Sequence, residues 1–333
     1  MKSRKKLGLI ALMVIVALVL AACGGTGSTN GAEQEEEIVF PTKPITLVVP
    51  FAAGGISDTL SRAIAEVSKN YLDQPINVVN REGGSATVGT NEVITAKPDG
   101  YTLLYGSSGE LASGMHLVQA PYNMDSYTPL CQIGSMRGVL AVNKDAPWSN
   151  LEEFIAYAKE RPGEVTIGVP GKGNVITLVA HNFCRQAGIE LNFVPFQGSG
   201  PVIPALLGGH VDVAILNVPE ISGQYNAGEA GILAVFSEQR IDVIKDVPTA
   251  IEQGFDIVGG ASHFITAPNG VPEEVAQIIR DAMKKVTEDP KFIETTSKMG
   301  YEIIYNGDTE ACKAFLKDWH ETAGEIYKEL GMI

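Results

Sequence analysis

The sequence has little cysteine and little positive charge. Its 333 residues include 4 cysteines, and 25 lysines and arginines stand against 39 aspartates and glutamates, which gives a formal net charge of -14 at pH 7. A chain this acidic repels nucleic acid, so nucleic acid is not an expected partner. The same field opposes any anionic ligand, which must therefore be attracted locally. The length is enough for roughly two domains.

Motifs for catalysis and metal binding are also missing. No cysteine lies in a CxxC or Cys/His zinc spacing, and the histidines form no HExxH. No GxGxxG opens a helix after a strand, and neither GxxxxGK[ST] nor GxSxG occurs. We therefore expect no metal, no cofactor and no enzymatic activity. An extracellular hydrolase with a Ser/His/Asp set assembled in space remains the less favoured alternative.

The N-terminus has the layout of a secretory signal. Basic residues at positions 2–6 run into the apolar stretch Leu7–Leu20. The alternative is a retained membrane helix, but the run is short for a span of about 20 residues. Leu20–Cys23 resembles a bacterial lipobox, which implies cleavage after residue 22 and diacylglyceryl attachment to the sulfur of Cys23. We expect an extracytoplasmic protein that is lipid-anchored to the cell membrane.

The next segment, residues 23–38, predicts a tether. It is rich in glycine, serine and threonine and then acidic, a composition that cannot bury a core. The folded body should begin near Ile38. The remaining cysteines, Cys131, Cys184 and Cys312, are odd in number, so at most one disulfide can form. We favour small buried hydrophobic residues for all three.

Predicted strands and helices alternate along the rest of the chain. The strands are expected at 45–49, 76–79, 101–105, 139–142, 165–169, 192–195, 211–216 and 232–236. The helices are expected at 59–72 with Asp58 as N-cap, 86–96, 151–159, 175–187, 201–207, 221–227, 250–253, 272–288, 290–299 and 309–330. This order predicts an α/β fold with parallel or mixed sheets flanked by helices, in which ligands bind at the carboxyl ends of strands.

Glycine, serine and amide residues collect at five of those strand ends. They are residues 50–58, 106–109, 171–174 and 197–200, and Asn217. Glycine lets a backbone approach a ligand closely, and the N–H groups of a following helix can hold an anion. Plain turns are the alternative. Lys172 is the cation within these loops and either pairs with the anion or is solvated; Tyr225 and His263 either line the cleft or pack.

Several motifs together resemble one family, the receptors of tripartite tricarboxylate transporters, also called Bug-type binding proteins. The matching segments are 41–55 with Asp58, 80–84 with Gly89, 98–104, 194–199, 206–212, 246–249 and 267–272. The resemblance implies a two-lobed, type II periplasmic-binding-protein fold with a hinge. Residues 39–137 and 255–333 would form lobe I, and residues 138–254 would form lobe II.

The resemblance also implies a function without catalysis. The receptor would capture a small organic anion, mostly a di- or tricarboxylate or a related organic acid, and deliver it to large and small transmembrane subunits of a tripartite transporter. Sensing for a membrane histidine kinase is the alternative. We expect a monomer.

The resemblance places the ligand mainly on main-chain N–H groups and bridging waters. The candidate ligand-binding residues are Phe51, Ala53, Gly54, Gly55, Ser57, Asp58, Gly84, Ser85, Ala86, Ser107, Ser108, Lys172, Asn174, Thr177, Gly198, Ser199 and Asn217. The chain departs from the family pattern at Gly83–Ala86, commonly Gly-Ala-Gly-Gly, and at Ser262–His263, commonly Trp-Tyr. The stretch 173–177 also differs. These differences bear on ligand identity more than on fold.

Overall fold

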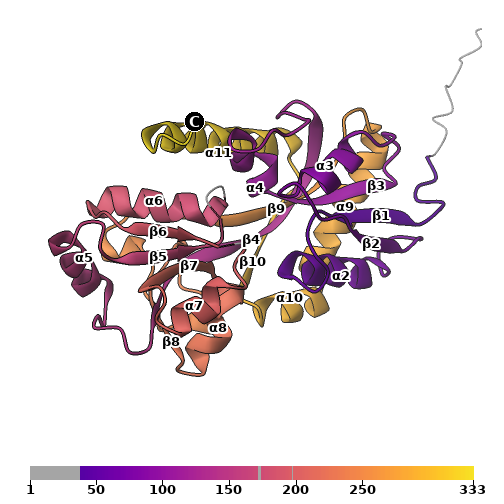
Figure 1. The fold of residues 1–333 in the computed structure, drawn as a ribbon. Helices are drawn as coiled ribbons and strands as arrows, with labels where there is room; N and C mark the ends of the chain where they lie inside the picture. The colour runs from indigo at the N-terminus through magenta and orange to yellow at the C-terminus, as the bar shows by residue number, and fades with distance from the viewer. Residues whose placement is uncertain (1–37, 172–173, 197) are drawn as a thin grey trace, which may run out of the picture. The chain divides into compact units, whose positions relative to one another are not determined.

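The structure, a computed structural model, describes residues 38–171, 174–196 and 198–333. Residues 39–333 form one compact unit with an extensive apolar core (Figure 1). The predicted signal segment, Cys23, the tether up to residue 37 and Lys172 lie outside the described residues. Among the helices that the structure does describe, none combines the length and the apolar character needed to cross a bilayer.

Strands and helices alternate through most of this unit. The strands are β1 Ile45–Val49, β2 Ile76–Asn80, β3 Thr102–Ser107, β4 Tyr127–Asn143, β5 Thr166–Val169, β6 Asn192–Pro195, β7 Val213–Asn217, β8 Ala230–Val235, β9 Gly260–Pro268 and β10 Tyr301–Asn306. The α-helices are α2 Ile56–Ser68, α3 Thr87–Ile94, α4 Ser108–Leu111, α5 Leu151–Glu160, α6 Val175–Ala187, α7 Val202–Leu207, α8 Val218–Asn226, α9 Glu273–Glu288, α10 Pro290–Ser297 and α11 Thr309–Glu329. Short 3-10 helices are η1 Ser113–His116, η2 Asp242–Ile244 and η3 Ile251–Gln253.

One long strand, β4, takes part in two sheets. Its first part, Tyr127–Arg137, pairs with β9 and β10 in sheet A, and its last part, Gly138–Asn143, pairs with β7 and β8 in sheet B. Sheet A continues as β9-β3-β1-β2, and sheet B continues as β7-β5-β6. Strands β1, β2 and β3 are parallel, as are β5, β6 and β7. The expected α/β class is confirmed, with mixed rather than purely parallel sheets.

Helices cover both sheets, and α11 touches each. Figure 1 shows α2 and α3 beside β1–β3, and α6, α7 and α8 beside the strands of sheet B. The first half of α11 packs Leu316 in a cluster with Phe264 of β9. Its second half packs Tyr327 and Ile326 against Leu178 of α6. A single helix therefore joins elements of the two sheets through apolar contacts.

Local signals placed several elements correctly. Helix α6 matches the predicted range, because Asn174 caps its start with a hydrogen bond from the N–H of Ile176 (3.1 Å) and Gly188 ends it in the left-handed conformation (φ 63°). The predicted strand 192–195 also matches β6. The three cysteines Cys131, Cys184 and Cys312 are free and buried, as expected of small hydrophobic residues.

The predicted start of the first helix was wrong. Helix α2 begins at Ile56 rather than Thr59, and its N-cap is Gly55 in an extended conformation rather than Asp58. Asp58 lies inside the first turn, where its carboxylate accepts the N–H of Gly54 (2.9 Å). The side chain thus closes the preceding loop instead of capping the helix from outside.

The sequence predicted only helices after residue 250, but this part of the chain also contains strands. It contains β9 and β10, which the sequence analysis missed. Every residue of β9 is buried, so the strand has no alternation of apolar and polar residues to reveal it. Strand β4 begins at Tyr127 rather than at 139, and β3 and β7 end later than predicted, so Ser107 and Asn217 are their last residues rather than loop residues.

Glycines occupy the seam where β4 passes from sheet A to sheet B. The N–H of Gly138 donates to the carbonyl of Gly259 (2.9 Å), and the N–H of Gly259 donates to the carbonyl of Phe236 (3.0 Å). A Cβ atom on Gly260 would lie 1.9 Å from the carbonyl oxygen of Met136. A Cβ on Gly138 would meet Phe236 at 3.4 Å, an ordinary contact. The close approach of β9 to β4 therefore requires glycine at position 260.

We predict that Gly260→Ala destabilises the fold by about 3 kcal/mol or more, because backbone atoms on β4 cannot yield as a side chain would. Gly138→Ala, across the seam, should change the free energy of unfolding by less than about 1 kcal/mol. Urea unfolding of both variants measures the difference. Equal stabilities would show that the two strands do not approach as closely as described.

Candidate functional site

The ends of the parallel strands converge on the middle of β4. Ser107, the last residue of β3, lies opposite His263 of β9, which lies opposite Gly134 of β4. Asn217, the last residue of β7, lies opposite Gly138. Strand β3 runs in the direction of β4 and β7 runs against it, so their carboxyl ends point toward each other. Positions 134 and 138 are roughly 14 Å apart along a strand.

The first loop of sheet A, residues 50–58, is tied down by Asp58. Its carboxylate accepts the N–H of Gly54 (2.9 Å) and forms an ion pair with Arg62 (3.0 Å). Burial acts to raise the pKa of Asp58, but hydrogen bonds from Arg62 and Gly54 outweigh it and lower that pKa. Asn80, at the end of β2, donates to the carbonyl of Phe51 (3.0 Å). The loop therefore has a fixed shape with its charge internally paired.

This loop leaves main-chain donors free. The N–H groups of Ile56, Ser57 and Asp58 belong to the first turn of α2, and among the described residues they have no acceptor. The stretch from Phe51 to Gly55 is exposed. Unpaired N–H groups at a helix N-terminus favour an anion, which is the chemistry expected for this loop.

The second loop of sheet A holds an unusual backbone. Gly83, Gly84, Ser85 and Ala86 all have positive φ, with values of 126°, 57°, 54° and 74°. Serine and alanine adopt this conformation only at a cost of about 1–2 kcal/mol each. Ala86 is buried, whereas Gly84 and Ser85 are exposed. The loop keeps a left-handed course although two of its four positions carry side chains where the family commonly has glycine.

The third strand end, at Ser107 and Ser108, is committed to neighbouring protein groups. The N–H of Ser107 donates to Glu110 (2.5 Å), and its hydroxyl donates to the same carboxylate. Ser108 is fully buried, and its hydroxyl accepts the N–H of Ser262 (3.3 Å). Both serines therefore organise the end of β3, and the hydroxyl of Ser107 is left with acceptor capacity only.

The strand ends of sheet B form a second group. Asn174 caps α6, and the hydroxyl of Thr177 donates to the carbonyl of Gly171 (2.8 Å). Asn217 donates its N–H to Glu220 (2.7 Å) and its side-chain amide to the same carboxylate (3.2 Å). Ser199 also hydrogen-bonds Glu220. The predicted residues of sheet B thus fall in two hydrogen-bonded groups, one at the start of α6 and one around Glu220. Gly198, beside Ser199, has a left-handed backbone (φ 91°).

Two glutamates of the site were missed from the sequence. Glu110 follows Ser107 and Glu220 follows Asn217 by three residues, which is the spacing of a capping box. That spacing was a readable signal. Burial raises the pKa of Glu110 to about 7 and also raises the pKa of Glu220. Each strand end that points to the middle of β4 therefore has a carboxyl group behind it.

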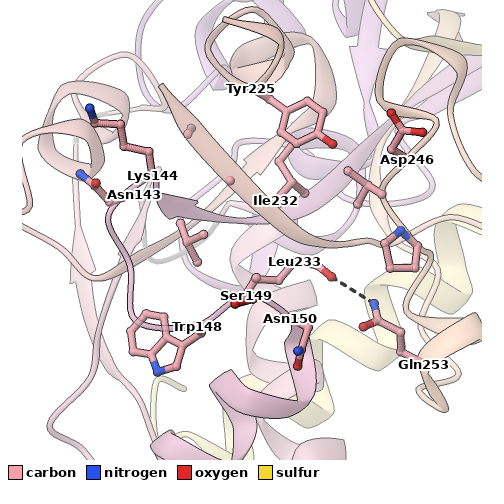
Figure 2. Close-up of a pocket in the computed structure, with 15 residues that line it drawn as sticks. Asn143, Lys144, Trp148, Ser149, Asn150, Tyr225, Ile232, Leu233, Asp246 and Gln253 are labelled. Atoms are coloured by element: carbon pink, nitrogen blue, oxygen red, sulfur yellow. Dashed lines mark hydrogen bonds between the residues drawn. The ribbon is translucent and has the colours of Figure 1, made fainter. Parts of the chain in front are cut away.

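A separate pocket of about 440 Å³ lies elsewhere in the unit (Figure 2). It is lined by residues of β4, β8 and α8 and of nearby loops, among them Asn143, Trp148, Tyr225 and Gln253. The side chains of Asn143 and Gln253 are engaged with the carbonyls of Leu206 and Leu233. Tyr225, considered above as a cleft residue, lines this pocket, but none of the candidate ligand-binding residues does, so the pocket does not belong to the strand-end site.

Metal binding finds no support within residues 38–171, 174–196 and 198–333. No group of three or more histidine, cysteine, aspartate or glutamate side chains is placed there to hold an ion. The strand ends instead offer main-chain N–H groups, hydroxyls and amides. Such an arrangement can bind a small anion reversibly.

Comparison with known proteins supports the same interpretation, the reversible binding of a small molecule. A family model described as "Tripartite tricarboxylate transporter family receptor" matches residues 60–332. The chain is 30% identical to a TctC solute-binding protein from Polaromonas, with a TM-score of 0.74 over 87% of this chain and 100% of that one.

Two further structures contain ligands. MatC from Rhodopseudomonas palustris, with bound malate, is 26% identical with a TM-score of 0.74 over 86% of this chain and 99% of that one. A second R. palustris protein, with adipate, is 28% identical with a TM-score of 0.77 over 88% of this chain and 99% of that one. The match to the family model spans most of the folded unit, and the chain therefore belongs to the tripartite tricarboxylate transporter receptor family, whose members bind solutes rather than catalyse reactions.

Proposed function

We propose that this chain captures a small carboxylate outside the membrane and delivers it to the large and small membrane subunits of a tripartite transporter. The proposal rests mainly on one observation. The strand ends of both sheets converge on residues 134–138 of β4. An anion held there would meet N–H groups of α2 from one side and polar residues of sheet B from the other. The malate and adipate complexes of related proteins support a dicarboxylate.

The two sheets are the natural cores of two lobes. Strands of sheet A come from residues 45–137 and 260–306, and strands of sheet B come from residues 138–235. This supports a lobe I of residues 39–137 and 255–333 and a lobe II of residues 138–254. The two lobes would be connected by β4, by the seam at Gly259 and by α11. Because these connections are few, the lobes could close on the ligand by bending there.

The first loop, residues 50–58, has no lysine or arginine. It would therefore recognise the ligand without a cationic side chain. Arg62, on the helix that follows the loop, is paired with Asp58. Main-chain N–H groups recognise a carboxylate by its charge and oxygens and make few demands on the rest of the molecule. The lipobox-like segment ending at Cys23 supports a lipid anchor, which would keep the receptor beside its transporter.

We predict that malate, adipate or another dicarboxylate raises the melting temperature of residues 24–333. A ligand that binds only the folded state stabilises it by about 2.7 kcal/mol at one hundred times its Kd. That corresponds to a shift of roughly 5 °C for a protein of this size. The matched control is the neutral diamide of each acid, which should give no shift. If no member of a broad carboxylate panel shifts the melting temperature, the proposed ligand class is wrong.

A second prediction concerns the shape of the first loop. Asp58→Ala leaves the N–H of Gly54 and the guanidinium of Arg62 without their acceptor, so we expect a loss of about 2 kcal/mol in stability and a Kd at least tenfold weaker. Asp58→Asn keeps an oxygen for Gly54 and should retain most of the affinity.

The control for this prediction is Glu66→Ala on the same helix. Glu66 forms exposed ion pairs with Lys69 and Lys291, so its loss should change stability by less than about 1 kcal/mol and leave binding unchanged. Calorimetric titration measures each Kd. Wild-type affinity in Asp58→Ala would mean that this loop does not position the ligand.

A further inference from the structure

The two strand ends that point to the middle of β4 share one device. In each, a glutamate at the third helical position accepts hydrogen bonds from the main chain and side chain of the last strand residue. Glu110 does so for Ser107, and Glu220 does so for Asn217. Glu110 is the more deeply buried of the two, with 7% of its surface exposed, whereas Glu220 is partly exposed. Each carboxyl group is hydrogen-bonded directly to a residue that is proposed to face the ligand.

The surroundings of Glu110 contain no compensating cation among the described residues. The groups hydrogen-bonded or electrostatically coupled to it are Ser107, Tyr105, Tyr122 and Tyr127. The other elements packed against α4 contribute His116 of η1, His263 of β9 and His320 of α11, and the remaining charged side chains of α11, both lysines and acids, are exposed. Burial lowers the pKa of His263 to about 3 and also lowers the pKa of His116, so both are neutral near pH 7. Among the described residues no cation is paired with the carboxylate of Glu110, which is stabilised by the hydrogen bonds from Ser107.

The negative charge of an anion at Ser107 would repel the carboxylate of Glu110 directly. The main-chain nitrogen of Ser107 lies 2.5 Å from an oxygen of Glu110, so a ligand atom in contact with Ser107 would be about 4–6 Å from it. A like charge at that distance disfavours ionisation. Burial already raises the pKa of Glu110 to about 7 in the free protein. Little additional repulsion is needed to shift the group to its neutral form.

We propose that Glu110 takes up one proton from the solvent when the carboxylate ligand binds, so that the ligand replaces the charge of Glu110 instead of adding to it. The carboxylate becomes a carboxyl group whose O–H can donate to the hydroxyl oxygen of Ser107. The hydroxyl hydrogen of Ser107, which is donated to Glu110 in the free protein, is then free to be donated to the ligand, which remains ionised. This inference rests on the proposed function. It makes Glu110 a positioning residue that links affinity to pH.

Linkage gives the sign of the effect. Because the ligand-bound form holds more protons, affinity falls as pH rises through the interval between the free and bound pKa values of Glu110, by at most tenfold per pH unit. Malate and adipate are fully ionised above pH 6.5, so they contribute no titration of their own. The Kd should therefore weaken severalfold or more between pH 6.5 and pH 8.5.

Titration calorimetry on residues 24–333 tests the proposal with whichever of malate and adipate raises the melting temperature more. Binding enthalpies measured at pH 8 in phosphate and in Tris, which differ in ionisation enthalpy, give the number of protons taken up. We expect between about 0.5 and 1 for the wild-type protein. An infrared difference spectrum should show a protonated-carboxyl band appearing on binding.

The decisive variant is Glu110→Gln, with Glu252→Gln, which closes a capping box with Thr249 outside the site, as its matched control. Glutamine satisfies a capping box as glutamate does, so both variants should fold. Glu110→Gln should lose the proton uptake, the pH dependence of Kd and the infrared band, and Glu252→Gln should keep all three. Uptake that persists in Glu110→Gln, or that disappears in Glu220→Gln instead, overturns the assignment.

The outcomes separate this inference from the proposed function. If neither malate nor adipate binds at any pH, the dicarboxylate function fails and the inference falls with it. If the wild-type protein binds one of them with no proton uptake and a flat pH profile, the function stands and only the role of Glu110 is wrong. Should Glu110→Gln fail to fold, the proton count and the infrared band of the wild-type protein still decide.

Discussion

The pairing of β4 with both sheets fixes the geometry on which the site depends. Main-chain hydrogen bonds align Ser107 with position 134 through β9, and Asn217 with position 138 directly. A shift of one residue in either pairing would turn every side chain of a strand to its other face. The two sets of strand ends are therefore held in a defined relation by backbone register, and the glycines of the seam allow β9 to approach β4 closely enough to maintain it.

The negative net charge of the chain is the second constraint, and local contacts at the site offset it. A chain of net charge -14 would bind the proposed anion against its own field. In the first loop, Asp58 is neutralised by Arg62 and holds the N–H of Gly54. At the strand ends, Glu110 and Glu220 are held by hydrogen bonds and burial raises the pKa of each. The carboxyl groups nearest the site are thus either paired or shifted toward the neutral form.

The sequence predicted the elements with local signals and missed those that tertiary pairing defines. Helix α6 has its own N-cap, Asn174, and its own C-terminal glycine. Strand β9 has no readable period, because it is buried throughout and includes His263 among its buried residues. The candidate residues of each sheet were found from their glycines and amides. Glu110 and Glu220 were overlooked although their capping-box spacing was visible, because their importance comes from burial, which no local pattern reveals.

The fold alone does not determine ligand choice. Relatives with TM-scores of 0.74 and 0.77 contain malate and adipate on the same fold, so the fold does not by itself distinguish these acids. Differences must come from side chains at the strand ends and from loop shape, and here this chain departs from the family at Ser85 and Ala86, which keep a left-handed backbone without glycine. Conformational strain of this kind persists only where surrounding contacts enforce it. A loop so restrained presents its N–H groups in one arrangement and, if it binds the ligand as proposed, would favour a single carboxylate geometry over a range of them.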